Sequence, residues 1–419
     1  MSATARIAIR AEVAVVGCGI VGLSCAHELM RRGYDCVLVD AKGPGAETSF
    51  GNAGSISVGN LMPQSTPDIA LKALRMLADP LGPLKLDWAA LPDYWRWLLQ
   101  FMLHGRRGNI LPIIDALHAI NTAARECWIA LADDIGASEL LGHDGYLHVY
   151  SRDASFEAGA WERELMRERS VRFDVLDRQQ LQALEPAIGP GFRQAVFQRD
   201  SLAMRDPGGF CQRLFNALVA RGAQSLTAKV AAIAAGDGGY RLSTDGGEVR
   251  ADKVVIAAGA WSNRLLASFG VRVPVVPARG YHLMYPPQPV TVRRPTLWAE
   301  RYMVLSPMQH GIRMTSVKEL TSLDSAPRFE LIRRLDPEAR KLIPTLAGAP
   351  VSEWAGLRPC TPDSLPIIDR IGTEDVYLAT GHGHLGLTQA PITGRLIGEC
   401  VAGATPRIPL APYRIGRFA

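Results

Sequence analysis

The chain has few cysteines, and none of them form a C-x-x-C pair. Its 419 residues include seven cysteines, at positions 18, 25, 36, 127, 211, 360 and 400. An odd number of scattered cysteines argues against a disulfide framework and indicates reduced thiols. The segment before residue 13 lacks the apolar core of a secretory signal. No run approaches the roughly 18 continuous apolar residues of a membrane-spanning helix, so we expect a cytoplasmic location.

Motifs that define several other classes of protein are also missing. The formal net charge is only +5, and no dense basic run is interleaved with aromatic residues, which argues against nucleic acid binding. The chain has no G-x-S-x-G and no G-x-x-x-x-G-K, the patterns of α/β-hydrolases and P-loop proteins. His382 and His384 have no third ligand nearby in the sequence, so we expect no metal site.

A strand, a glycine turn and a helix stand together within residues 13–40. Four apolar residues, 13–16, predict a buried parallel strand, and apolar residues at helical spacing predict a helix after the turn. A second apolar strand ends on Asp40, 23 residues after the first glycine. The turn has the pattern G-x-G-x-x-G, formed by Gly17, Gly19 and Gly22.

This pattern is typical of dinucleotide binding. Gly17 permits a tight turn, Gly19 lets the backbone approach a pyrophosphate, and Gly22 lets the helix pack closely on the strand. We expect the helix to begin at Gly22 and to end near Gly33, with its N-terminal N–H groups directed at the phosphates. Asp40 can accept hydrogen bonds from a ribose. These residues alone do not distinguish NAD from FAD, and a structural βαβ turn is the alternative.

Two further stretches stand out before residue 110. The loop 41–54 is rich in glycine and small polar residues, and it can offer backbone N–H groups and the hydroxyls of Thr48 and Ser49 to a ligand. A surface loop is the alternative. The aromatic, apolar segment 91–107 has a basic end. We interpret it as a helix packed into a second domain, and the alternative is a helix at a membrane interface.

The rest of the chain alternates between helical and strand patterns. Gly259 interrupts a buried strand at a point where the backbone could approach a cofactor. We expect helices at 110–135, 160–185, 210–221, 327–343 and 388–402, and strands at 145–150, 226–258 and 376–380. Asp245-Gly246-Gly247 is a hairpin signal.

Four more motifs follow the glycine turn in order. They are T-S-F-G-N-A-G at 48–54, A-A-G-A-W-S at 257–262, G-L-R-P-x-x-P-D-x-x-P at 356–366 and G-H-G-H-L-G-L-T at 381–388. Together these motifs resemble the FAD-dependent D-amino acid oxidase superfamily, which includes glycine oxidase. The asparagine loop and D-P-L-G-P at 79–83 are most similar to bacterial D-amino acid dehydrogenases and D-hydroxyproline dehydrogenases.

The resemblance implies an α/β fold with two domains. A discontinuous, Rossmann-type FAD-binding domain would comprise residues 1–60, 191–273 and 351–419. An α+β substrate domain built on a mixed or antiparallel sheet would comprise 61–190 and 274–350. FAD would be bound noncovalently, because no cysteine corresponds to an attachment site. Its implied contacts are Gly17, Gly19, Ile20, Val21, Gly22, Asp40, Thr48, Ser49, Asn52, Ala53, Gly54, Val230, Ala258, Gly259, Gly383, His384, Leu385, Gly386, Leu387 and Thr388.

The resemblance also assigns substrate residues. Arg358 of the G-L-R-P motif would bind the substrate carboxylate, and a planar guanidinium does meet a carboxylate in a two-pronged fit. A structural ion pair is the alternative for Arg358. Tyr281, Tyr302 and Arg313 are further candidates, because the resemblance places their strands near the substrate. Each of the three could equally be a core or rim residue.

The implied reaction is oxidation of the Cα–N bond of a D-amino acid or a cyclic D-imino acid such as D-hydroxyproline. A hydride would pass from Cα to flavin N5, and the imine would give a 2-oxo acid. Electrons would pass to a quinone or respiratory chain, with the protein cytoplasmic or peripheral on the inner face of the cytoplasmic membrane. The alternatives are a glycine or sarcosine oxidase of the same fold, a non-catalytic FAD-binding accessory subunit, and an NAD-dependent dehydrogenase.

Overall fold

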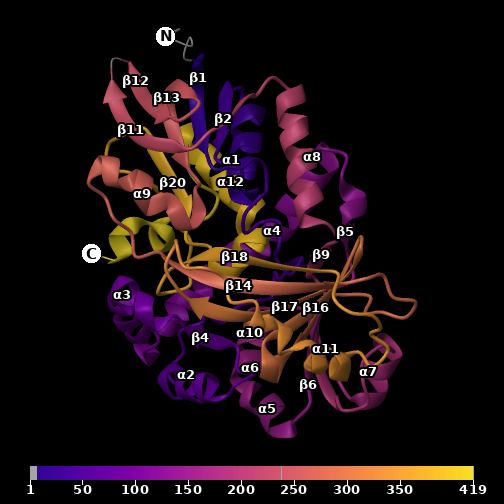
Figure 1. Cartoon of the computed structure of the whole chain (residues 1–419). Coiled ribbons are helices and arrows are strands. Elements are labelled where there is room, and N and C mark those ends of the chain that lie inside the picture. Colours follow the sequence, from indigo (N-terminus) through magenta and orange to yellow (C-terminus); the bar gives the residue numbers. More distant parts are fainter. Residues whose placement is uncertain (1–6, 237, 419) are drawn as a thin grey trace.

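A computed structural model describes residues 7–236 and 238–418 of the chain. Two large sheets and a three-stranded sheet organise these residues. The first large sheet lies in the upper half of Figure 1, and the second crosses the middle of the molecule.

The first sheet has the strand order β10-β2-β1-β13-β12-β11, with β20 beside β13 and β19 beside β20. The strands β10, β2, β1, β13 and β20 are parallel, and the apolar runs of β2, β1, β13 and β20 are buried on both faces. The predicted hairpin is confirmed, since Thr244 pairs with Gly247. The strands are β1 (Ile7–Val16), β2 (Cys36–Asp40), β10 (Gln224–Thr227), β11 (Val230–Gly236), β12 (Gly239–Thr244), β13 (Gly247–Ile256), β19 (Ile367–Arg370) and β20 (Val376–Thr380).

Two apolar cores cover the two faces of the first sheet. One core joins Val13, Val15 and Leu38 to four helices, and the other joins Ala14 and Val16 to β11, β12 and a short helix. The four helices are α1 (Ile20–Arg31), α4 (Arg107–Asp134), α8 (Pro207–Ala220) and α12 (Gly386–Val401), and the short one is α9 (Ser262–Leu266).

The sequence pattern predicted that the helix after the glycine turn begins at Gly22, but it begins at Ile20. Gly19 is its N-cap, and the Leu23 N–H already donates to the Gly19 carbonyl. The apolar spacing marks only the buried face of the helix, so it could not show that the first turn contains a glycine. The last helix likewise begins at Gly386, two residues before the predicted start.

The second sheet is mixed, with the order β18-β14-β17-β16-β15-β6-β8-β7 and with β4 beside β17. Its helix-covered face packs against α7 (Arg178–Leu184), α10 (Glu330–Arg333) and α11 (Asp336–Leu342). Its strands are β4 (Leu84–Leu86), β6 (Tyr146–Tyr150), β7 (Phe173–Leu176), β8 (Gln194–Gln198), β14 (Val276–Tyr285), β15 (Thr296–Trp298), β16 (Met303–Met308), β17 (Gly311–Leu320) and β18 (Ser352–Cys360). The strands β14, β17 and β18 therefore lie between these helices and the first sheet (Figure 1).

Smaller elements complete the described chain. The helix α3 (Leu91–His104) buries Tyr94 and Trp97 against β14 and β17, as the packed-helix interpretation predicted. The other helices are α2 (Ile69–Ala78), α5 (Asp153–Ala158) and α6 (Ala160–Glu168), and the third sheet consists of β3 (Ser55–Ile56), β9 (Leu202–Met204) and β5 (Leu141–Gly142). The 3₁₀ turns are η1 (Trp88–Ala90), η2 (Ser138–Leu140), η3 (Gly259–Trp261), η4 (Ala267–Phe269), η5 (Ala299–Arg301), η6 (Gly383–Leu385), η7 (Ala411–Tyr413) and η8 (Ile415–Phe418). Within the described ranges, no helix has the length and apolarity needed to span a bilayer.

The strand pairing differs from the predicted division of the chain. The strands β8 and β18 pair in the second sheet, although 191–273 and 351–419 were expected in the FAD-binding domain. The helix α4, expected in the substrate domain, packs in the core of the first sheet. Motif order fixes where a residue stands along the chain, but it does not show which sheet edge a strand joins.

The predicted helix at 160–185 is wrong. This segment forms α6, then β7, then α7. The strand follows a short alternation of charged and apolar residues in 172–176, which the surrounding helical pattern obscured.

Candidate active site

The carboxyl ends of β1, β2, β13 and β20 meet at one edge of the first sheet. Gly17 follows β1, and its φ of 108° is in the left-handed region that favours glycine. A Cβ at Gly17 would lie 2.4 Å from the Ala257 carbonyl oxygen, and a Cβ at Gly22 would lie 1.9 Å from the Gly17 carbonyl oxygen. Backbone atoms are therefore closely packed at this edge, and parallel α/β sheets bind dinucleotides in the crevice outside the carboxyl ends of their strands.

The N-terminus of α1 opens into this crevice. Its N-cap, Gly19, has no side chain, and the Ile20 N–H donates to Ser49 Oγ at 2.9 Å. The N–H groups of Val21 and Gly22 stand in the first turn, where no intrahelical acceptor exists. Free N–H groups, a positive helix end and a serine hydroxyl form a donor set that fits a pyrophosphate.

Asp40 lies at the end of β2 beside the glycine turn. Its Oδ2 accepts the Cys18 N–H at 2.7 Å, and its Oδ1 accepts the N–H groups of Lys42 and Gly43 at 2.8 and 2.9 Å. Asp40 thus fixes the turn and the following loop. Since a carboxylate has about four acceptor sites, the predicted contact with a ribose stays open.

The loop 48–54 is held by side chains of the second sheet. Arg313 Nη1 donates to the carbonyls of Phe50 and Asn52 at 3.0 and 2.8 Å. His282 Nδ1 donates to the Gly51 carbonyl at 3.0 Å, and Ser306 Oγ donates to the Ala53 carbonyl at 2.6 Å. Four successive carbonyls are thus bonded from β14, β16 and β17. We call this arrangement the loop clamp: Arg313, His282 and Ser306 with the carbonyls of residues 50–53.

Aromatic packing and an asparagine complete the loop. Trp354 stacks on His282 with ring centroids 5.3 Å apart, and a Cβ at Gly51 would lie 2.1 Å from the tryptophan ring. Asn52 donates to the Ser49 carbonyl and accepts the Gly54 N–H, both at 2.7 Å. Thr48 Oγ1 donates to the carbonyl of residue 357 on β18 at 2.7 Å. The loop thereby joins the first sheet to the strand that bears Arg358.

Burial sets the ionisation of the loop clamp. Burial and the Arg313 charge lower the pKa of His282 to about 4, so this histidine is neutral at neutral pH. Burial lowers the pKa of Arg313 to about 10, which still leaves the guanidinium charged.

The other predicted cofactor residues lie along the same edge of the first sheet or on α12. Gly259 follows β13 with a φ of 53°, and its carbonyl accepts Thr380 Oγ1 at 2.9 Å. Val230 is buried at the start of β11, two residues after Ala228, whose N–H donates to the Asp40 carbonyl at 2.8 Å. Ala258 adjoins Gly17, within 3.1 Å of a Cβ built there.

The motif at 381–388 turns the chain into α12. Gly381 and Gly383 have φ values of 78° and 54°. The N-cap of α12 has no side-chain hydrogen bond, so the N–H groups of Leu387 and Thr388 stand in an open first turn. Thr388 Oγ1 accepts the N–H of Ser57 at 3.0 Å. This bond ties the start of α12 to the chain just after the loop clamp.

Arg358 lies on β18 with its guanidinium over β14. A Cβ at Gly280 would be 2.1 Å from Arg358 Nη2, so only glycine leaves room for this guanidinium. Its hydrogen bond, from Nη1 to the Val317 carbonyl, is long at 3.4 Å. Among the described residues no carboxylate lies within ion-pair distance of Arg358, so its alternative interpretation as a structural ion pair is wrong. Burial lowers the pKa of this unpaired arginine.

The structure adds Lys318, which the sequence did not single out. Lys318 pairs in register with Gly280, and its Nζ donates to Gln64 Oε1. The same Gln64 amide contacts His384 Nδ1 at 2.7 Å through its Nε2. Desolvation and the charges of Lys318 and Arg358 lower the pKa of His384, although its side chain is exposed to solvent.

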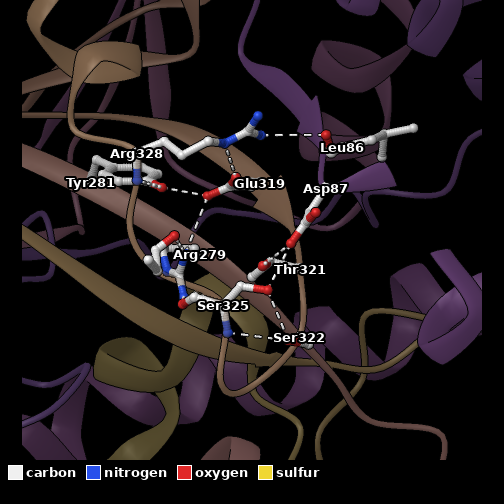
Figure 2. Close-up of polar contacts among 10 residues, drawn as sticks. Leu86, Asp87, Arg279, Tyr281, Glu319, Thr321, Ser322, Ser325 and Arg328 are labelled. Carbon is white, nitrogen blue, oxygen red and sulfur yellow. Dashed lines mark hydrogen bonds and ion pairs between the residues drawn. The ribbon is translucent and has the colours of Figure 1, made fainter. Parts of the chain in front are cut away.

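The structure does not bring Tyr281 or Tyr302 to Arg358. Tyr281 points to the opposite face of β14, where its hydroxyl donates to Glu319 and accepts the Arg328 N–H at 3.0 Å (Figure 2). Tyr302 is 52% exposed after η5, and no hydrogen bond or ion pair joins it to Arg358 in the described chain. Arg313, the third of these candidates, lies in the loop clamp. Tyr281 and Arg313 lie on strands of the predicted sheet and Tyr302 directly precedes β16, so the direction of each side chain decided the outcome.

The two histidines of the last motif separate. His382 is buried and its Nε2 lies 3.0 Å from Thr393 Oγ1, whereas His384 faces Gln64. Across residues 7–236 and 238–418, no three His, Cys, Asp or Glu side chains gather in a way that could hold a metal ion.

Comparisons with known proteins show the family to which the chain belongs. A family model described as FAD dependent oxidoreductase matches residues 12–400. Among similar proteins of Bradyrhizobium diazoefficiens, a D-amino-acid oxidase is 32% identical over 417 residues (97% of this chain, 99% of the relative), and a D-amino acid dehydrogenase is 29% identical over 424 residues (97% and 99%). The solved structure of glycine oxidase from Geobacillus kaustophilus shares the fold, with a TM-score of 0.78, 20% identity and coverage of 97% of this chain and 98% of that one.

The glycine crevice, the open helix end and the two-sheet architecture define a dinucleotide-binding redox protein. The chain belongs to the FAD-dependent oxidoreductase family, and its cofactor is FAD. The predicted fold class, cofactor and enzyme class are thereby confirmed. An NAD-dependent dehydrogenase and a non-catalytic accessory subunit are not supported.

Proposed function

We propose that the protein oxidises the Cα–N bond of a D-amino acid or a cyclic D-imino acid, with FAD bound noncovalently. The observation that carries this proposal is Arg358, a guanidinium held over Gly280 with no carboxylate partner among the described residues. Arg358 is partly buried, and a partly buried charge without a partner is unfavourable unless a ligand supplies the opposite charge. The α-carboxylate of an amino acid meets that requirement, and relatives at about this similarity are named for D-amino acids.

Different residues of the site would bind the two ligands, FAD and the substrate. The first turn of α1, Ser49 and the loop clamp would hold FAD, which when bound accepts the hydride that leaves the substrate Cα. Arg358 would bind and orient the substrate carboxylate, so that the Cα–H bond faces the flavin. The amine would react in its neutral form, because its lone pair forms the C=N bond as the hydride leaves. Water then hydrolyses the imine to a 2-oxo acid and ammonia, whereas a cyclic substrate leaves a cyclic imine.

We also propose a quinone or respiratory chain as the electron acceptor, at the inner face of the cytoplasmic membrane. One relative is named a dehydrogenase, which supports an acceptor other than oxygen. In addition, α3 exposes Trp95, Leu99 and Leu103, and α2 exposes Leu71 and Leu74. An exposed apolar surface of this kind suits a lipid interface.

Anaerobic reduction of the purified flavoprotein tests the substrate. We expect the flavin absorbance to bleach with D-amino acids, D-proline or cis-4-hydroxy-D-proline, and not with L-enantiomers. Bleaching only by glycine or sarcosine would replace the proposal with the amine-oxidase alternative. No bleaching by any amine would refute it.

Co-sedimentation with anionic phospholipid vesicles tests the membrane contact. We expect binding by the intact protein and loss of binding in Trp95→Ser/Leu99→Ser. The buried Trp97 is not a suitable target, because its Nε1 donates to the Cys360 carbonyl at 3.0 Å inside the core. Absence of the intact protein from the vesicle pellet would contradict the contact.

A further inference from the structure

We propose that Lys318 is a second anion-binding residue of the substrate site, and that the preferred substrate is a D-amino acid with a carboxylate in its side chain. This inference rests on the proposed function and narrows its substrate class. It is carried by the placement of Lys318 next to Arg358, by a break in the alternation of β17, and by the lack of an acidic partner for either cation.

Backbone pairing makes the two cations neighbours. Gly280 on β14 pairs with Gly356 on β18 and with Lys318 on β17. Paired residues of adjacent strands project from the same face of a sheet. Arg358, two residues from Gly356, projects from this face too, and its guanidinium crosses Gly280 to reach the Val317 carbonyl. That carbonyl belongs to the residue immediately before Lys318.

A bulge in β17 gives Lys318 this direction. The pairing of β14 with β17 shifts between Gly280 and Tyr281, which leaves Val317 as an extra residue on β17. Val317 has a φ of 62°, which is rare and strained for a β-branched residue. Its side chain enters the core of the second sheet together with that of Met314, three positions earlier. In a regular strand Val317 would share the face of Arg313, and Lys318 would point into the opposite face.

No acid in the described chain neutralises Lys318. The nearest carboxylate in sequence, Glu319, is on the opposite face of β17, where it is bonded to Arg279, Arg328 and Tyr281 (Figure 2). Lys318 Nζ donates to the neutral Gln64 and lies 5.9 Å from the ring centroid of Trp97. Burial and Arg358 lower the pKa of Lys318, and a ligand carboxylate would reverse that shift.

The site thus presents two cations that a single dianionic ligand can satisfy. The α-carboxylate would bind Arg358, and the side-chain carboxylate would accept hydrogen bonds from Lys318 Nζ. Gln64 would keep the ammonium group in place, because its amide also contacts His384. A monocarboxylate would leave Lys318 without a counter-charge, so the site would select substrates that carry a negative charge in the side chain.

Anaerobic reduction of the holoenzyme compares acids with their amides. We expect D-glutamate or D-aspartate to half-saturate flavin reduction at about a tenfold to hundredfold lower concentration than D-glutamine or D-asparagine, the range of one charge-assisted hydrogen bond. Lys318→Met should abolish this ratio by weakening binding of the acids alone, and Lys318→Arg should restore part of it. The control is Lys72→Met, since Lys72 on α2 is exposed and paired with Asp68 at 2.8 Å.

Four outcomes would overturn the inference. Equal half-saturation by acids and amides in the unmodified enzyme would refute it and leave the proposed function intact. Equal losses for acids and amides in Lys318→Met would mean that Lys318 only holds Gln64. A shifted flavin reduction potential in Lys318→Met, with the acid-to-amide ratio unchanged, would mean that Lys318 serves the cofactor. Reduction by no D-amino acid would refute both proposals together.

Discussion

The two faces of β14 and β17 differ in how their charged side chains are paired. On the face toward the second core, Glu319 is 1% exposed and is bonded to Arg279, Arg328 and the Tyr281 hydroxyl (Figure 2). On the face toward the first sheet, Arg358 and Lys318 have no acidic partner among the described residues. The first arrangement is complete within the protein, and the second requires a ligand.

One strand serves both faces only because its alternation is broken. The bulge at Val317 separates Glu319 from Arg313 by an extra residue, so that Lys318 shares the face of Arg313 and Arg358. A residue in a strained backbone region costs roughly 1–3 kcal/mol, and such residues cluster at functional sites. The matched charges on the other face are the local interactions that can offset this strain.

Glu319→Gln tests the face whose charges are paired within the protein, and it should give the largest change in stability. Arg279, 5% exposed and 3.6 Å from Glu319, would be left as an uncompensated buried charge. Breaking a buried pair in this way costs about 3–5 kcal/mol. We expect that loss in the free energy of unfolding of the FAD-loaded protein, measured by denaturant titration. The KM of the surviving enzyme should change little, and a large rise in KM at full stability would contradict the comparison.

Arg358→Lys tests the face whose cations have no acidic partner. This variant should change KM and leave the stability almost unchanged. A lysine keeps the charge but loses the two-pronged fit to a carboxylate. We expect KM for the amino acid to rise about a hundredfold, the equivalent of roughly 2.7 kcal/mol. FAD content and the free energy of unfolding should stay near those of the unmodified protein, because no partner loses its counter-charge. Near-normal steady-state kinetics would remove Arg358 from the substrate site.

The same contrast shows what could be predicted from the sequence. The glycine crevice and Arg358 were accessible, because each depends on a local turn or a short motif. The position of Lys318 was not, because period-two alternation assigns it to the face of the second core until the bulge is known. Arg313 was predicted on the correct strand, but its role depends on the carbonyls of a loop some 260 residues earlier in the chain.

Arg313→Met tests whether the loop clamp contributes to FAD binding. This substitution removes two hydrogen bonds to the carbonyls of Phe50 and Asn52 while keeping an apolar side chain of similar length. Hydrogen bonds from a charged donor contribute about 1.5–3 kcal/mol, so we expect the Kd of FAD to rise tenfold or more, measured by flavin fluorescence on dilution of the holoenzyme. Arg313→Lys should lose less. An unchanged Kd would show that the loop clamp does not support FAD binding.

His282→Gln should have the smallest effect, and only in acid. The pKa of His282 in the folded protein is lowered to about 4 from the ordinary 6.5, so the neutral form contributes stability that is complete above pH 6.5 and is lost as the pH falls toward 4. We therefore expect the free energy of unfolding of the unmodified protein to fall between pH 6.5 and 4.5. Glutamine can donate to the Gly51 carbonyl without titrating, so the variant should be almost equally stable at pH 7.5 and show a flatter profile. The difference between the two profiles is the informative quantity, because the pKa values of His148 and His382 are also lowered, to about 4 and 3, by burial. Parallel profiles would assign the acid sensitivity to those histidines and not to the loop clamp.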